Sequence, residues 1–146
     1  MKSGKENHNR AVSVRARLLQ LARMRQTEFQ NVLSDFAIER LLYRLGASEY
    51  ASRFVLKGAM LFKFWPSEGG RATWDLDLLG RGSSELNDIG AVFEQLCSSD
   101  EDDGIVYSLD SIRVERIRVA DNYPGVRVRI EAHLAEARIP VQVDDP

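Results

Sequence analysis

Cysteine is nearly absent from this sequence. The 146 residues include a single cysteine, Cys97, which excludes an internal disulfide and a zinc site built from cysteine thiolates. Cys97 stands near the end of a segment with helical periodicity, and no histidine lies near it in the sequence. Because a catalytic thiol needs an adjacent base, we expect Cys97 to be a packing residue rather than a nucleophile.

Long apolar runs and a strong net charge are missing as well. No stretch approaches the roughly 20 apolar residues of a membrane-spanning helix, and the opening segment MKSGKENHNR lacks the apolar centre of a signal peptide. We therefore expect a cytoplasmic protein with no membrane partner. The formal net charge of -2 excludes a chain that coats nucleic acid over its whole surface.

Basic residues are nevertheless concentrated at the start of the chain. Residues 1–30 hold seven basic residues against two acidic ones. Such a segment is either a solvated helix face or a contact for a polyanion.

Apolar spacing predicts helices in the first third of the chain, whose total length suits one domain. We expect the polar residues 1–10 to be flexible. Two amphipathic patterns follow, formed by Val14, Leu18 and Leu21 and then by Ile38, Leu41, Leu42 and Leu45. Thr27 is the candidate N-cap of the second helix, which should end near Gly46.

Alternation of polar and apolar residues predicts strands in the rest of the chain. We expect strands at residues 54–56, 73–79, 112–119, 126–134 and 139–144, with helices at 59–65 and 84–96. A phase slip near Glu115 indicates a bulge, residues 122–125 form a turn, and the acidic run 100–103 is most simply a solvated loop. The element order predicts a single α+β domain, with a helical part at 11–52 and a mixed sheet of about five strands at 53–146.

Asp75 and Asp77 are the first candidate functional residues. Alternation puts them on one face of a strand, with Cα atoms about 7 Å apart. Two hard oxygen ligands at this spacing suit Mg²⁺, which completes its shell with water and phosphate oxygens. An isolated Asp-x-Asp pair is also compatible with two exposed acids, so the neighbouring motifs decide its meaning.

Gly58 supplies the first of these motifs. It lies seventeen residues before Asp75, directly after a buried strand and at the start of a helical pattern. Backbone N–H groups at a helix start form a phosphate site, and glycine allows close approach. Lys57 and Arg71 add positive charge nearby in the sequence. The order predicts a triphosphate cradle beside a metal site, although Gly58 alone would indicate only a tight turn.

A third acid is expected on a neighbouring strand. Asp144 has the outward phase of Gln142 rather than the core phase of Val143, and Asp145 is the alternate. Such a carboxylate completes a second metal site or acts as a base toward an attacking hydroxyl. A polar residue at a strand end is the simpler alternative.

The histidines and tryptophans carry no clear chemistry. His8 falls in the polar tail and His133 on an exposed strand position. Trp65 and Trp74 are expected in the core or at its rim, although Trp74 adjoins the metal residues.

Three stretches together resemble the AbiEii/AbiGii toxin family. They are FVLKGAMLF at residues 54–62, RATWDLDLL at 71–79 and ARIPVQVD at 137–144. The resemblance runs from about residue 10 to residue 144 and implies the nucleotidyltransferase fold of the DNA polymerase β superfamily. It implies an enzyme of toxin–antitoxin or abortive-infection systems, which transfers a nucleotide from a nucleoside triphosphate with Mg²⁺ or Mn²⁺.

The resemblance also implies partners and roles for individual residues. The acceptor is an RNA, tRNA in some relatives, or a protein hydroxyl, and the toxin is encoded beside an antitoxin. Carried over by position, Asp75, Asp77 and Asp144 bind metal and are catalytic, whereas Lys57, Gly58, Ala59, Arg71 and Thr73 line the triphosphate site.

Two departures from the family pattern stand out. Gly58 is followed by Ala59, where the family pattern has glycine or serine. Alanine also has a backbone N–H, so this donor is kept. Relatives continue after the third acid into a mainly helical domain that supplies a lysine and an acid. We expect that domain to be absent from this chain, which ends at Pro146.

Two other classes of function are therefore considered. The first is a truncated, catalytically inactive module that binds nucleotide or a protein partner, with a homo-oligomer as one way to complete the site. The second is a phosphatase of the haloacid dehalogenase type. It fits less well, because the residues before Asp75 are not an apolar strand and Leu79 replaces the expected Thr or Val.

Overall fold

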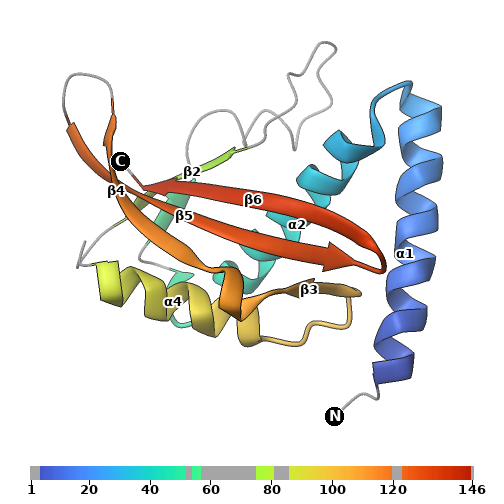
Figure 1. The fold of residues 1–146 in the computed structure, drawn as a ribbon, viewed down its shortest axis with the longest axis horizontal. Helices are drawn as coiled ribbons and strands as arrows, with labels where there is room; N and C mark the ends of the chain where they lie inside the picture. The colour runs from blue at the N-terminus through green and yellow to red at the C-terminus, as the bar shows by residue number, and fades with distance from the viewer. Residues whose placement is uncertain (1–3, 52–53, 57–74, 81–85, 120–122, 146) are drawn as a thin grey trace.

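The structure is a computed structural model, and it describes residues 4–51, 54–56, 75–80, 86–119 and 123–145. The helices are α1 (Gly4–Arg25), α2 (Phe29–Gly46) and α4 (Leu86–Ser98), with a 3₁₀ turn η2 (Leu109–Ser111). The strands are β1 (Phe54–Leu56), β2 (Asp75–Gly80), β3 (Ile105–Tyr107), β4 (Arg113–Val119), β5 (Tyr123–Leu134) and β6 (Ala137–Asp145). Figure 1 shows these elements. No helix among them is long and apolar enough to cross a bilayer.

The sheet is mixed, which confirms the predicted α+β class. Its order is β1-β2-β6-β5, and β3 and β4 both pair with β5. The strand β2 runs parallel to β6, while the other pairs are antiparallel. The strand β4 pairs with the first part of β5 and β3 with its last part, so the turn η2 interrupts one edge of the sheet.

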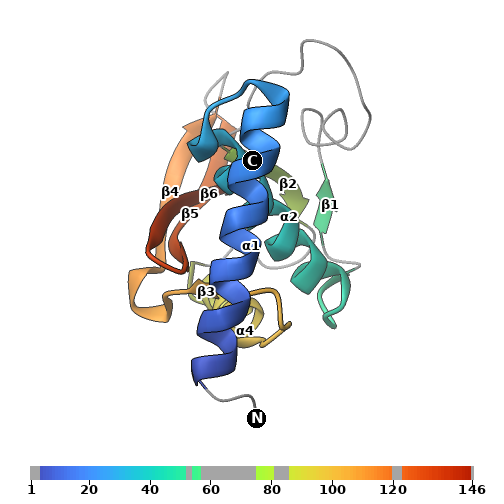
Figure 2. The ribbon, with the colours of Figure 1, turned by 90° about the vertical axis from the view of Figure 1, so that its right-hand side faces the viewer.

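One face of β5 and β6 forms the core. Val126, Val128, Ile130, Val141 and Val143 are all buried. The helix α2 lies behind these strands in Figure 1 and α4 below them, and the turned view of Figure 2 keeps both helices on the same side of the sheet. In β5 and β6 the alternating apolar residues therefore face this core, and the polar residues between them face the opposite side.

The acidic run 100–103 is not simply a solvated loop. Arg44 places its Nη1 2.8 Å from Oδ2 of Asp103, and Arg40 places its Nε 2.7 Å from the same oxygen. The Arg44 side chain is 1% exposed and the Asp103 side chain 9%. Arg44 belongs to α2 and its guanidinium is buried. A buried positive charge requires a carboxylate partner, which is why Asp103 is not solvated.

The helices differ in two details from the sequence pattern. The helix α1 begins at Gly4, ahead of the amphipathic pattern that starts at Val14. Glu28, not Thr27, is the N-cap of α2, and it makes no side-chain cap hydrogen bond. At Gly104, φ is +81° and a Cβ would lie 2.7 Å from the Cα of Ala11. The loop that precedes β3 therefore approaches α1 closely at Ala11 and packs against the first turns of the helix.

The strand predictions need correction at β3 to β5. The strand β3 was not foreseen. Strand β4 has no bulge, since its pairs with β5 run without a break from Arg113–Arg129 to Val119–Tyr123. Arg116 breaks the alternation of polar and apolar residues in β4. It is exposed on this edge strand, so no bulge is needed to bring its side chain to solvent. The expected turn at 122–125 is also too long, because β5 begins at Tyr123.

Candidate active site

The parallel pair β2–β6 brings the three predicted acids to neighbouring positions. Asp75 pairs with Gln142, and Asp77 pairs with Asp144. Neighbouring strands lie about 4.8 Å apart, and residues paired in parallel register belong to the same face of a sheet. Asp144 therefore stands on the strand next to the Asp-x-Asp motif, as the sequence predicted.

Asp144 is held by an arginine that the sequence analysis did not single out. Arg127 donates from Nε to Oδ1 of Asp144 at 2.8 Å and from an Nη2 to Oδ2 at 3.2 Å. The side chains are 28% and 16% exposed. This two-bond fork is the strongest geometry for an arginine and a carboxylate. Arg127 and Asp144 are register partners across β5 and β6.

The next row of the sheet is also polar. Arg129 pairs with Gln142 across the same strands, and its Nε lies 3.5 Å from the Gln142 side-chain oxygen. Its Nη1 lies 3.4 Å from Oε1 of Glu115 on β4. Asp75 continues this row on β2.

These rows belong to the face of β5 and β6 opposite the core, which we call the open face. Its β5 and β6 residues are Arg127, Arg129, Glu131, His133, Arg138, Pro140, Gln142 and Asp144. No helix that the structure describes lies over it (Figures 1 and 2). Charged groups of both signs gather there, with the acids of β2 in register at one side.

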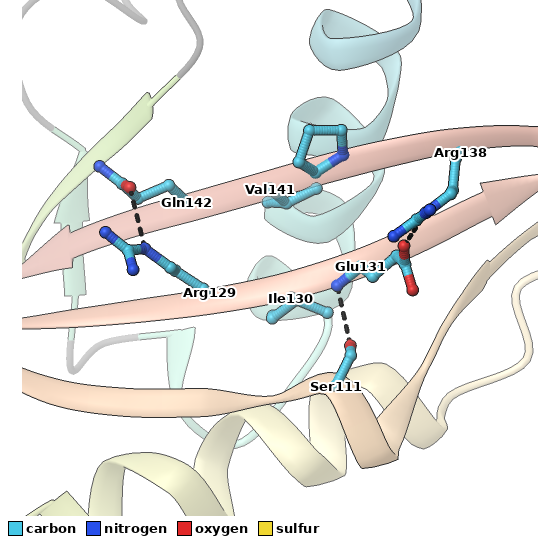
Figure 3. Close-up of a pocket in the computed structure, with 8 residues that line it drawn as sticks. Ser111, Arg129, Ile130, Glu131, Arg138, Val141 and Gln142 are labelled. Carbon is cyan, nitrogen blue, oxygen red and sulfur yellow. Dashed lines mark hydrogen bonds and ion pairs between the residues drawn. The ribbon is translucent and has the colours of Figure 1, made fainter.

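A hollow of about 550 Å³ lies on the open face. It is lined by Ser111, Arg129, Ile130, Glu131, Arg138, Pro140, Val141 and Gln142. Figure 3 shows Arg129 facing Gln142 and Arg138 facing Glu131 across the two strands. The Glu131 backbone N–H donates to Oγ of Ser111 at 2.8 Å, where η2 interrupts the sheet edge.

The donor set at the β2–β6 pair fits a hard divalent cation. Asp77 and Asp144 are register partners and Asp75 lies two residues before Asp77 on β2, and carboxylate oxygen is the ligand that Mg²⁺ prefers. Among the described side chains, no group of three His, Cys, Asp or Glu residues is arranged to hold a metal. The strand pairing gives the positions of Asp75 and Asp77 along β2.

The predicted triphosphate residues lie outside the described residues. They are Lys57, Gly58, Ala59, Arg71 and Thr73, and the helix expected at 59–65 falls in the same segment. The strand β1, which ends at Leu56 just before this segment, pairs with β2 on the side away from β6.

Cys97 takes no part in the site. It is buried in the core, and burial raises the pKa of its thiol to about 12 although the charge of Arg44 acts in the opposite direction. A thiol with so high a pKa is not a nucleophile at neutral pH, which confirms its predicted packing role.

Arg127 was missed for a structural reason. Alternation in residues 126–134 already places it on the polar face, but its partner depends on the register of the β5–β6 hairpin. The turn residues of that hairpin are Ala135 and Glu136, with φ of 54° at Ala135. Because the turn lacks the usual Asn or Gly, the sequence gives no signal for the register.

The comparisons with known proteins agree with this geometry. The family model described as nucleotidyl transferase AbiEii toxin, of type IV toxin–antitoxin systems, matches residues 40–145. The match includes every strand of the sheet and the acids on β2 and β6. No curated protein matches the chain.

Proposed function

The chain belongs to the AbiEii family of nucleotidyltransferase toxins, and we propose that it transfers a nucleotide from a nucleoside triphosphate to the hydroxyl of an RNA or a protein. The reaction would depend on Mg²⁺ or Mn²⁺. The observation that carries the proposal is the β2–β6 pairing, which sets Asp77 opposite Asp144, with Asp75 two residues before Asp77 on the same strand.

The three acids would hold the metal. When bound, the divalent ion would neutralise the charge of the triphosphate. Asp75 and Asp77 would be the two ligands from one strand, and Asp144, on the neighbouring strand, would add the third. Asp144 would also accept the proton of the attacking hydroxyl.

The two sides of the acids would have different tasks. The proposed cradle of Lys57, Gly58, Ala59, Arg71 and Thr73 follows β1, which pairs with β2 on the side away from β6. Attacking and leaving oxygens lie roughly in line in phosphoryl transfer. The acceptor should therefore approach over β6 and β5, which is the side of the hollow.

The hollow suits part of a nucleotide or another hydroxyl acceptor. Its volume of about 550 Å³ lies within the usual range of ligand pockets. Arg129 and Arg138 bring positive charge to its rim. An RNA end would use these arginines for its phosphates. Family membership also supports an antitoxin partner, and self-association is one way to extend the site.

A catalytically inactive, nucleotide- or partner-binding module is the second candidate function. One observation favours it, namely that Arg127 already engages both oxygens of Asp144. In that case Arg127 would be a permanent substitute for a cation. The chain would then keep the fold without transferring nucleotides.

Nucleotide transfer itself is the direct test. The chain is incubated with cellular RNA, protein extract and each α-³²P-labelled ribonucleoside triphosphate, with Mg²⁺ or with EDTA. We expect label on one acceptor class, at least about a hundredfold less with Asp77→Asn, since a lost metal ligand removes several kcal/mol of transition-state stabilisation. Glu94→Gln, an exposed acid on α4, is the control and should label normally. Full activity of Asp77→Asn with an unchanged melting temperature would refute the assignment.

A further inference from the structure

Arg127 occupies a fixed position on the sheet. The strand β5 pairs with β6 on one side and β4 on the other, and Arg127 has register partners on both, Asp144 and Glu115. Its backbone is therefore held along both edges. Two hydrogen bonds, at 2.8 and 3.2 Å, then fix its guanidinium against the Asp144 carboxylate.

The fork uses the same atoms that a divalent cation needs. Both carboxylate oxygens of Asp144 accept a hydrogen bond from Arg127. A cation that binds these oxygens would come close to the positive guanidinium, and two like charges at such a distance repel strongly where solvent is partly excluded. Asp144 is 16% exposed, so screening by water is limited there.

The fork also places a positive charge beside the register partner of Asp77. Asp77 pairs with Asp144, and Asp75 lies two residues before Asp77 on β2. Carboxylates at adjacent positions destabilise one another when all are ionised, and a neighbouring positive charge offsets that repulsion. Arg127 supplies this charge from β5.

We propose that Arg127 is a positioning residue that serves as the resident counter-ion of Asp144, and that a divalent cation binds the third carboxylate only by displacing the Arg127 fork. This inference rests on the proposed function, because it assumes that Asp144 is a metal ligand. The displaced guanidinium would then face the anionic substrate that arrives with the metal. Arg127 thereby couples the metal-free and metal-bound states of the site.

The test measures metal affinity without any turnover. Mn²⁺ is titrated into the full chain, and free Mn²⁺ is followed by electron paramagnetic resonance. We expect Arg127→Gln to bind Mn²⁺ about tenfold more tightly, a change that corresponds to about 1.4 kcal/mol of lost competition. Arg127→Lys keeps the charge but not the fork, so it should lie between the wild type and Arg127→Gln.

Two further variants separate the fork from a general charge effect. Arg129→Gln removes a positive charge from the same strand and face, two residues away, and should change the affinity less than twofold. In the Asp144→Asn background, Arg127→Gln should no longer tighten binding, because the coupling between the two residues is lost. Without metal, Arg127→Gln should have a lower melting temperature than Arg129→Gln, since three acids lose their counter-ion.

The outcomes distinguish this inference from the proposed function. If Mn²⁺ binds the wild type and Asp77→Asn abolishes binding, but Arg127→Gln binds equally or more weakly, the counter-ion role is overturned while the metal site stands. Binding by Arg127→Gln alone supports the displacement mechanism. If neither binds Mn²⁺ and both are folded, both ideas fail. Should Arg127→Gln not fold, Arg127→Lys decides, and an affinity equal to the wild type overturns the inference.

Discussion

At the scale of single residues, the ion pair between Arg44 and Asp103 is buried beside the core. Arg44 meets Asp103 at 2.8 Å and its guanidinium also lies over the ring of Tyr107, 5.0 Å from the centroid. Burial alone would raise the pKa of Asp103, but hydrogen bonds and charges from Arg44 and Arg40 outweigh it and hold that pKa below its ordinary value. The pair thus joins α2 to the entry of β3.

We expect Asp103→Asn to lower the free energy of unfolding at pH 7 by roughly 3–5 kcal/mol, because Arg44 would remain buried without its charge partner. Urea unfolding measures this change. Asp102→Asn is the matched control. Asp102 lies 3.7 Å from Arg10 with both side chains about half exposed, so its loss should cost less than about 1 kcal/mol. Equal effects of the two substitutions would contradict the buried pair.

The same pair should make stability depend on pH. The folded-state pKa of Asp103 is lowered. The contribution of Asp103 to stability is therefore present above the unfolded-state pKa of about 3.9 and is lost as the pH falls through the folded-state pKa. The difference in stability between wild type and Asp103→Asn should therefore be complete above about pH 5 and should shrink below about pH 4. A difference that stays constant between pH 7 and pH 3 would contradict this account.

At the scale of secondary-structure elements, glycine decides how the β3 entry meets α1. Gly104 has φ of +81°, and an added Cβ would lie 2.7 Å from the Ala11 Cα and 2.9 Å from the Ala11 N. These contacts are with backbone atoms, which cannot rotate away as a flexible side chain would. The residue thus sets the distance between the loop and the helix.

We expect Gly104→Ala to lower the free energy of unfolding by roughly 1–3 kcal/mol, from left-handed backbone strain and the clash with Ala11. Gly46→Ala is the control, because a Cβ at Gly46 would meet nothing within 4 Å. It should be neutral or stabilising by up to about 1 kcal/mol. Thermal unfolding of the two variants measures both effects. A Gly104→Ala protein with the same free energy of unfolding as the wild type would show that α1 does not pack closely on this loop.

Other features of the elements were predictable from local pattern alone. The sequence alternation of β5 and β6 predicted their buried faces, and the phase of Asp144 against Val143 predicted that Asp144 lies on the face opposite the core. The strand β3 was not predicted, because its three residues directly follow the acidic run and Gly104, which indicated a loop. The pairing of Arg127 with Asp144 likewise depended on the hairpin register, which no turn motif indicated.

At the scale of the whole molecule, the order of elements was enough to predict the class of fold. Helices come first, and a mixed sheet follows, with α4 between its strands in the sequence. Long-range pairs were beyond the sequence, as Arg44 and Asp103 are 59 residues apart. The family match begins at residue 40, within α2. The helix α1 and the first half of α2 therefore lie outside the part of the chain that defines the family.

The central claim is that the acids on β2 and β6 form a metal-dependent nucleotide site. Isothermal titration of the 146-residue chain with each of the four ribonucleoside triphosphates, with Mg²⁺ and with EDTA, tests it most directly. The account predicts binding of at least one triphosphate that requires Mg²⁺ and disappears in the double variant Asp75→Asn/Asp77→Asn. Binding of none of the four by a folded sample, or binding that survives EDTA and both substitutions, would contradict it.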